Sequence, residues 1–167
     1  MVLSEWIVGD GELDRPRPGT VLGHVGLRAS AVDVAGDAGR PEGGPAAAAE
    51  WPSPAGPVEE VRGLTGPARD FFVDAGQGRS RRVGAEFVLD AGAYRVLAST
   101  PLPAAEVREG EAVLFRCVLS VIADYEWQGF GLPDVRQEWT VLGVGHRGGD
   151  FLLDLEPGAP PGHGPAG

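Results

Sequence analysis

Carboxylates and imidazoles toward the end of the chain are the residues best suited to do chemistry. Asp124 and Glu126 lie two residues apart, so in a strand both side chains leave the same face. Glu138 follows on the next expected strand, and His146 and Asp150 lie in the turn after it. His24 would join them if its own strand lay beside that face. Such a set could hold a divalent metal ion or act as general acid and base. The simpler interpretation is a polar sheet face whose carboxylates pair with Arg116 and Arg136.

Aromatic residues surround one glycine-rich loop, QGFGLPD, which follows the longest predicted strand. The glycines beside Phe130 present a single apolar side chain to solvent, and loops on rigid scaffolds are where recognition concentrates. Trp and Tyr are also enriched at the energetic centres of protein interfaces. The alternative is a core end-cap in which Trp127 pairs with Trp139. The predicted binding surface consists of Tyr125, Trp127, Phe130 and Trp139.

Three arginines within GQGRSRR form the strongest local positive charge. Arg79, Arg81 and Arg82 could bind an anion such as phosphate, although clusters of this kind are usually solvated loops. The whole chain carries a formal charge of −10, and a phosphate backbone repels such a surface. Nucleic-acid binding is therefore not expected. It would need these three arginines to share one aromatic-lined face with Arg28 and Arg95.

Residue types that the chain lacks exclude several classes of chemistry. There is no lysine, which excludes Schiff-base chemistry and the phosphate loop that ends in Gly-Lys-Ser/Thr. The absence of both lysine and asparagine indicates a GC-rich bacterial genome. The single cysteine, Cys117, excludes an intrachain disulfide and paired cysteine ligands for zinc. No cofactor is expected, and the expectation leans against an enzyme.

Strands are predicted to position these residues. From Val113 to Trp127 every odd-numbered residue is apolar, which is the period of a strand with one buried face. This period places Cys117 in the core as a small, poorly reactive hydrophobe. Val83–Leu89 and Tyr94–Ala98 alternate on either side of a turn at Asp90–Ala93, which predicts a hairpin.

Further segments bring the count to about seven to nine strands. Val135–Val144 and Phe151–Leu155 are predicted to follow the long strand in an antiparallel three-strand meander. Glu5–Val8 could form an edge strand, and Thr20–Val34 forms one or two strands. Two short segments, Val58–Leu64 and Arg69–Val73, lie between Thr20–Val34 and the predicted hairpin.

Glycine and proline supply a quarter of the 167 residues, 27 and 15 respectively, which suits short strands and turns rather than helices. The sequence therefore predicts an all-β fold with little helix, built as a single antiparallel barrel or sandwich. One domain is expected over residues 1–156, with a flexible Gly/Pro/Ala-rich insertion at 36–57. A disordered tail is expected at 157–167.

Binding rather than catalysis is the expected function. The first residues lack the basic and apolar regions of a secretion signal, and no run approaches a membrane span in length. The cytoplasm is therefore the expected location, without membrane contact. We expect a module that binds another protein, or a second copy of itself, through the aromatic loop or a sheet edge. The alternative is an enzyme or small-ligand carrier whose barrel cavity, with or without a metal, uses Asp124, Glu126, Glu138 and His146.

Overall fold

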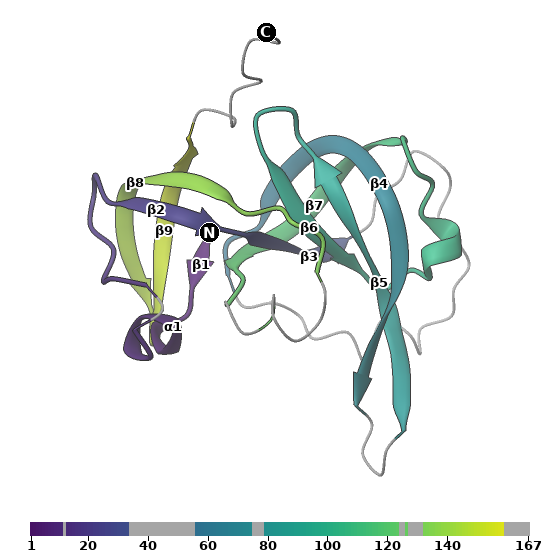
Figure 1. The fold of residues 1–167 in the computed structure, drawn as a ribbon, viewed down its shortest axis with the longest axis horizontal. Helices are drawn as coiled ribbons and strands as arrows, with labels where there is room; N and C mark the ends of the chain where they lie inside the picture. The colour runs from purple at the N-terminus through teal and green to yellow at the C-terminus, as the bar shows by residue number, and fades with distance from the viewer. Residues whose placement is uncertain (12, 34–55, 75–78, 124–125, 127–131, 159–167) are drawn as a thin grey trace, which may run out of the picture.

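A computed structural model of the protein describes residues 1–11, 13–33, 56–74, 79–123, 126 and 132–158. In this part of the chain, nine strands form one sheet, with one short α-helix and one short 3-10 helix (Figure 1). The predicted all-β fold with seven to nine strands and little helix is confirmed. The elements are β1 (Val2–Leu3), α1 (Glu5–Gly9), β2 (Val21–Val25), β3 (Leu27–Asp33), β4 (Glu59–Asp74), β5 (Ser80–Asp90), β6 (Arg95–Thr100), η1 (Ala104–Glu106), β7 (Ala112–Val121), β8 (Gln137–Arg147) and β9 (Asp150–Pro157).

Five strands close into a barrel in the order β7-β3-β6-β5-β4, and the pairing of β4 with β7 completes the ring. A barrel, one of the two predicted architectures, is therefore present. Its sheet is mixed rather than wholly antiparallel, because β3 runs parallel to β6, with Arg28 opposite Leu97. Parallel neighbours need a crossover between them. Here β4 and β5 supply it, since both lie between β3 and β6 along the chain.

The other four strands extend the sheet outside the barrel in the order β1-β9-β8-β2. β1 joins the two parts, because it pairs with β9 on one side and, through Val2 opposite Ser120, with β7 on the other. The predicted three-strand meander needs correction here: β8 and β9 form a hairpin, whereas β1 separates β9 from β7. A strand of two residues has no periodicity from which this insertion could have been predicted.

The alternation predicted around Cys117 is confirmed. On β7, Phe115 and Cys117 are buried in the barrel core, and Phe115 meets Phe87 of β5 edge to face, with ring centroids 5.8 Å apart. The paired strand ends at Val121 rather than at Trp127. Beyond it, Ile122 and Ala123 are still buried, and the Ile122 N–H donates to the Gly26 carbonyl at 3.0 Å, whereas Tyr125 and Trp127 lie outside the described residues.

β4 is a single strand of 16 residues where the sequence predicted two short segments, Val58–Leu64 and Arg69–Val73. Its first part pairs with β7 and its second part with β5, so it passes from one neighbour to the other around the barrel. Pro67, which cannot donate a ladder hydrogen bond, lies in a register shift between Thr65 and Ala68. An irregularity of this kind tolerates an unpaired residue, so the proline interrupts the pairing without ending the strand.

The first residues differ from the prediction. Glu5–Val8, expected as an edge strand, lies in α1, and β1 makes the strand pairing instead. One face of α1 buries Ile7 against the core, and a short apolar run allows such burial in either conformation. Thr20–Val34 contains two strands, one of the predicted alternatives, with the break at Gly26.

The predicted insertion at 36–57 lies outside the described residues apart from its last two. The predicted tail at 157–167 also lies outside them, apart from Pro157 and Gly158. Pro157 ends β9, and the Gly158 N–H donates to the Glu138 carbonyl at 2.8 Å, so these two residues belong to the fold. None of the described helices is long and apolar enough to cross a membrane.

Candidate functional site

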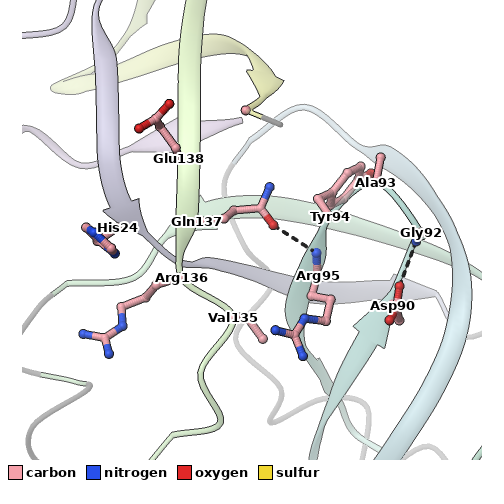
Figure 2. Close-up of a pocket in the computed structure, with 11 residues that line it drawn as sticks. His24, Asp90, Gly92, Ala93, Tyr94, Arg95, Val135, Arg136, Gln137 and Glu138 are labelled. Atoms are coloured by element: carbon pink, nitrogen blue, oxygen red, sulfur yellow. Dashed lines mark hydrogen bonds between the residues drawn. The ribbon is translucent and has the colours of Figure 1, made fainter. Parts of the chain in front are cut away.

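A pocket of about 360 Å³ opens where the turn between β5 and β6 faces β2 and β8 (Figure 2). It lies between the barrel and the outer sheet, since β5 and β6 belong to the barrel and β2 and β8 do not. Its volume is near the lower end of the range for small-ligand sites. The polar side chains in its wall include His24, Asp90, Tyr94, Arg95, Arg136, Gln137 and Glu138.

The β5–β6 turn fixes one side of the pocket. Asp90 Oδ1 accepts a hydrogen bond from the Gly92 N–H at 2.8 Å, and the Ala91 N–H donates to the Tyr94 carbonyl at 2.9 Å. Gly92 has a φ of 82°, which a residue without Cβ adopts at no steric cost. This is the predicted hairpin, and its turn presents Tyr94 and Arg95 to the pocket.

β8 and the residues before it form the opposite side. Trp139, 3% exposed, anchors β8 in the core: its Nε1–H donates to the Val25 carbonyl at 3.1 Å, and its ring lies 5.5 Å from that of Tyr94. Gln137 bridges the two sides, because its Oε1 accepts from the Arg95 N–H at 3.2 Å (Figure 2). The pocket wall is therefore tied together across the barrel and the outer sheet.

His24 lines the pocket in a strained backbone conformation. Its φ is 55°, and no other described non-glycine residue has a positive φ. The register between β2 and β8 shifts between Leu22 and Val25, so His24 lies within an irregularity of the edge strand. A left-handed backbone costs a non-glycine residue about 1–2 kcal/mol. Strain of this kind clusters at ligand-binding and active sites.

Two arginines of the pocket differ in their partners. Arg136 Nε donates to Asp134 Oδ1 at 3.0 Å, and this side-chain hydrogen bond is the main reason why the pKa of the Asp134 carboxyl is lowered. The charge of Arg95 lowers the same pKa to a smaller extent. Among the described residues, the Arg95 guanidinium has neither a hydrogen bond nor an ion pair.

The structure separates the predicted acidic and histidine residues. Glu138 lines the pocket with His24, as the sequence allowed if β2 lay beside β8. His146 lies eight residues further along β8, about 25 Å away on an extended strand, and its ring packs on Phe151 with centroids 4.9 Å apart. In the described ranges, no group of three or more His, Cys, Asp and Glu residues could hold a metal ion.

The remaining acidic residues do not join the pocket. Glu126 Oε2 lies 2.5 Å from Arg28 NH1 on the outside of the barrel. This carboxylate therefore forms an ion pair, as in the simpler interpretation, but its partner is Arg28, whereas the sequence suggested Arg116 and Arg136. Asp124 lies outside the described residues, and its predicted role stays a prediction.

The predicted aromatic surface falls mostly on residues that the structure does not describe. Tyr125, Trp127 and Phe130 are all in this group, so their part in binding stays a prediction. Trp139 is buried, and its contacts with Val25 and Tyr94 give it a core role.

The predicted anion-binding arginines lie far from the pocket. The distal ends of β4 and β5 project from the barrel as a two-stranded ribbon (Figure 1), and Arg81 and Arg82 are exposed on it, with Arg79 just before β5. Arg82 NH1 lies 3.6 Å from Asp70 Oδ1. Arg95 lies at the opposite end of the β5–β6 hairpin, so these arginines do not share one face.

Sequence reasoning did not predict that Tyr94 and Arg95 line the same pocket as His24. The hairpin signal alone placed Tyr94 and Arg95 next to a turn. Which strands face that turn depends on the pairing of β2 with β8, two strands separated by more than a hundred residues. No local pattern reveals such a pairing.

Fold and pocket together define a small all-β protein with a closed mixed barrel, an outer sheet and a polar pocket where the two meet. No family model matches the chain, and neither a curated protein nor a solved structure matches it.

Proposed function

We propose that the protein is a non-catalytic binding protein and that the pocket between the β5–β6 turn and β2–β8 holds a small polar ligand. The observation that carries this proposal is His24, which lines the pocket with a φ of 55°. A fold keeps a conformation that costs about 1–2 kcal/mol when the surrounding structure determines it, and functional sites are where such positions cluster.

The chemistry of the wall favours a ligand with an anionic group. The chain has 24 acidic residues and only 14 arginines, yet the Arg95 guanidinium in the pocket has no carboxylate partner among the described residues. A carboxylate or phosphate group of the ligand would supply that partner through charge-assisted hydrogen bonds. The imidazole of His24 and the carboxylate of Glu138 would select the remaining polar groups of the ligand.

A thermal-shift screen with small carboxylates and phosphate esters tests the proposal. A ligand of the pocket should raise the melting temperature with concentration, by about 2.7 kcal/mol of added stability at one hundred times its Kd. Arg95→Gln should weaken binding at least about tenfold, because a charge-assisted hydrogen bond is lost. Arg147→Gln is the matched control, since Arg147 is exposed at the far end of β8. Flat curves for all compounds, or equal losses in both variants, would contradict the proposal.

Substituting the strained residue should separate stability from binding. His24→Gly removes the left-handed penalty, so the free energy of unfolding should rise by about 1 kcal/mol while ligand affinity falls. Urea unfolding and ligand titration measure the two quantities. His146→Gly, on β8 at an ordinary φ, should instead lose stability and keep affinity. A stability loss in His24→Gly would show that the conformation carries no strain.

Protein binding through a sheet edge is a second candidate, and β2 favours it. β2 is at the end of the strand order, so one of its edges is unpaired within the described sheet, and its sequence VLGHV carries no acidic residue or arginine. Uncharged edges are ready templates for another strand. Val21 is 54% exposed there, and Leu142, two residues beyond its partner Thr140, is 51% exposed.

A charge placed on that edge tests the second candidate. Val21→Arg should abolish association with a partner chain or a second copy, measured by sedimentation and by cross-linking to β2, because an edge charge opposes strand addition. Arg95→Gln should leave that association intact. Cross-links that map to other surfaces would contradict edge binding.

A further inference from the structure

Three barrel strands carry polar side chains that are wholly or partly buried on the outside of the barrel. They are Arg28 on β3, Glu86 on β5 and Ser99 on β6. Arg28 is the partly buried one, with its side chain 22% exposed. Glu86 and Ser99 are each 3% exposed, although neither belongs to the apolar core. The register explains why they meet, because Glu86 lies directly opposite Ser99, and Arg28 lies opposite Leu97, two residues from Ser99 along the same strand. Such neighbours on one face have side chains within reach of each other.

Ion pairs satisfy one part of this group. Glu86 Oε2 accepts a hydrogen bond from Arg69 NH2 at 3.2 Å, and Arg28 NH1 pairs with Glu126 Oε2 at 2.5 Å. Glu86 Oε1 lies 3.5 Å from Arg28 NH2, which is an ion-pair distance without a hydrogen bond. The charges are therefore balanced, two guanidinium groups against two carboxylates.

Three buried atoms of the group nevertheless have no hydrogen-bond partner in the described part of the chain. They are Arg28 Nε, Glu86 Oε1 and Ser99 Oγ. A buried polar atom without a partner loses its hydration with no compensation, and such atoms are rare in folded proteins. Three of them, on side chains that are neighbours in the sheet, point to one shared partner.

The chemistry of the three atoms selects that partner. Arg28 Nε–H needs an acceptor, Glu86 Oε1 needs a donor, and the Ser99 hydroxyl can serve as either. A halide cannot donate to the carboxylate, and an ammonium or metal cation cannot accept from the guanidinium. We infer that this site binds one water molecule, which accepts from Arg28 and donates to Glu86 while the Ser99 hydroxyl takes the third hydrogen bond. Buried waters typically make about three hydrogen bonds.

The surroundings make this water slow to exchange. Leu97, Ile122 and Val135 form a separate buried apolar cluster, and Leu97 lies next to Arg28 across the β3–β6 pair. Apolar packing beside the site limits access from bulk solvent. The bound water is thus part of the structure that holds the carboxylate network on the barrel wall.

Magnetic relaxation dispersion of the water signal, together with a crystal structure that resolves solvent, tests the inference on the full chain. We expect a long-lived internal water, and a crystallographic water within about 2.7–3.2 Å of the three atoms. Ser99→Ala removes one of its three hydrogen bonds, so the water should exchange at least about fivefold faster or be lost. Ser30→Ala is the matched control, because Ser30 is paired with Ser99 on the neighbouring strand and none of its atoms is among the three.

Either of two results would overturn the inference. One is a structure in which Arg28 Nε, Glu86 Oε1 and Ser99 Oγ bond directly to protein groups, with no water among them. The other is a relaxation profile of Ser99→Ala that equals that of Ser30→Ala. The wild-type measurement stands on its own if a variant fails to fold.

Discussion

Cys117 shows how burial withdraws a reactive group from chemistry. The side chain is fully buried on β7, and burial first, then the charge of Glu59, raises the pKa of the thiol to about 12. The thiolate that reacts with electrophiles is then about 10⁻⁴ of the thiol at pH 8. We expect iodoacetamide to label the native protein at least about a thousandfold more slowly than the urea-unfolded chain. Mass spectrometry measures both rates, and comparable rates would place the thiol at the surface.

The same pKa shift predicts an alkaline loss of stability. The folded state holds the thiol proton more tightly than the unfolded state, so the stabilising effect is complete below the ordinary pKa of 9.0. It is lost as the pH rises from there toward 12, by at most about 1.4 kcal/mol per pH unit. Burial also raises the pKa of Tyr94, which adds to the trend. Cys117→Ala should flatten the curve of urea stability against pH above 9, and an unchanged slope would contradict this assignment.

Gly63 allows β4 to change neighbours at the corner of the barrel. It pairs with Val113 of β7, and the next residue, Leu64, pairs with both β7 and β5. A Cβ at position 63 would lie 2.5 Å from the Asp90 carbonyl oxygen and 2.8 Å from its carbon, so only glycine fits. Glycine at a tight corner is a recurrent device for closing barrels.

Gly63→Ala should therefore destabilise the barrel by about 1–3 kcal/mol, the usual cost of forcing atoms into a packed site. Gly143→Ala is the matched control on β8, where the nearest atom would be the Asp154 Cβ at 3.5 Å, an ordinary contact. Urea unfolding of both variants measures the difference. Equal stabilities would mean that the β4 corner adjusts without strain.

Local elements could be predicted and non-local ones could not. The β5–β6 hairpin was found because its turn, Asp90–Ala93, and both of its alternating strands lie within one short window. The buried face of β7 was found for the same reason. The parallel pair β3–β6 joins segments more than sixty residues apart, and nothing in either strand marks the other as its partner. β4 was divided in the prediction because Pro67 resembles a strand end in sequence.

At the scale of the whole molecule, the candidate site was likewise predicted only in part, because its residues come together through long-range pairing. Glu138 was predicted as a site residue, and the structure places it in the pocket. His24 was conditional on the neighbour of its strand, and Arg95 was considered only for nucleic acid. Their meeting depends on how the outer sheet sits against the β5–β6 turn, a relation between distant parts of the chain.

The closed barrel and the open outer sheet should differ in local stability. Within the closed part of the barrel each strand is paired on both sides, whereas β2 keeps an unpaired edge in the described sheet. Native-state hydrogen exchange should therefore find the slowest amides in β3, β5, β6 and β7, and faster exchange in β2. Amides of β2 that exchange as slowly as those of β7 would show a single cooperative unit or a protected edge.

The pairing of β1 constrains the order in which the sheet assembles during synthesis. Val2 and Leu3 are synthesised more than a hundred residues before their partners in β7 and β9. Val2 can pair with Ser120 once β7 has been synthesised, but Leu3 has no strand partner until Phe151 of β9 is present. The pairing that joins the barrel to the outer sheet therefore forms late. A nascent chain that lacks β8 and β9 would expose an unpaired strand edge, which another chain could pair with incorrectly.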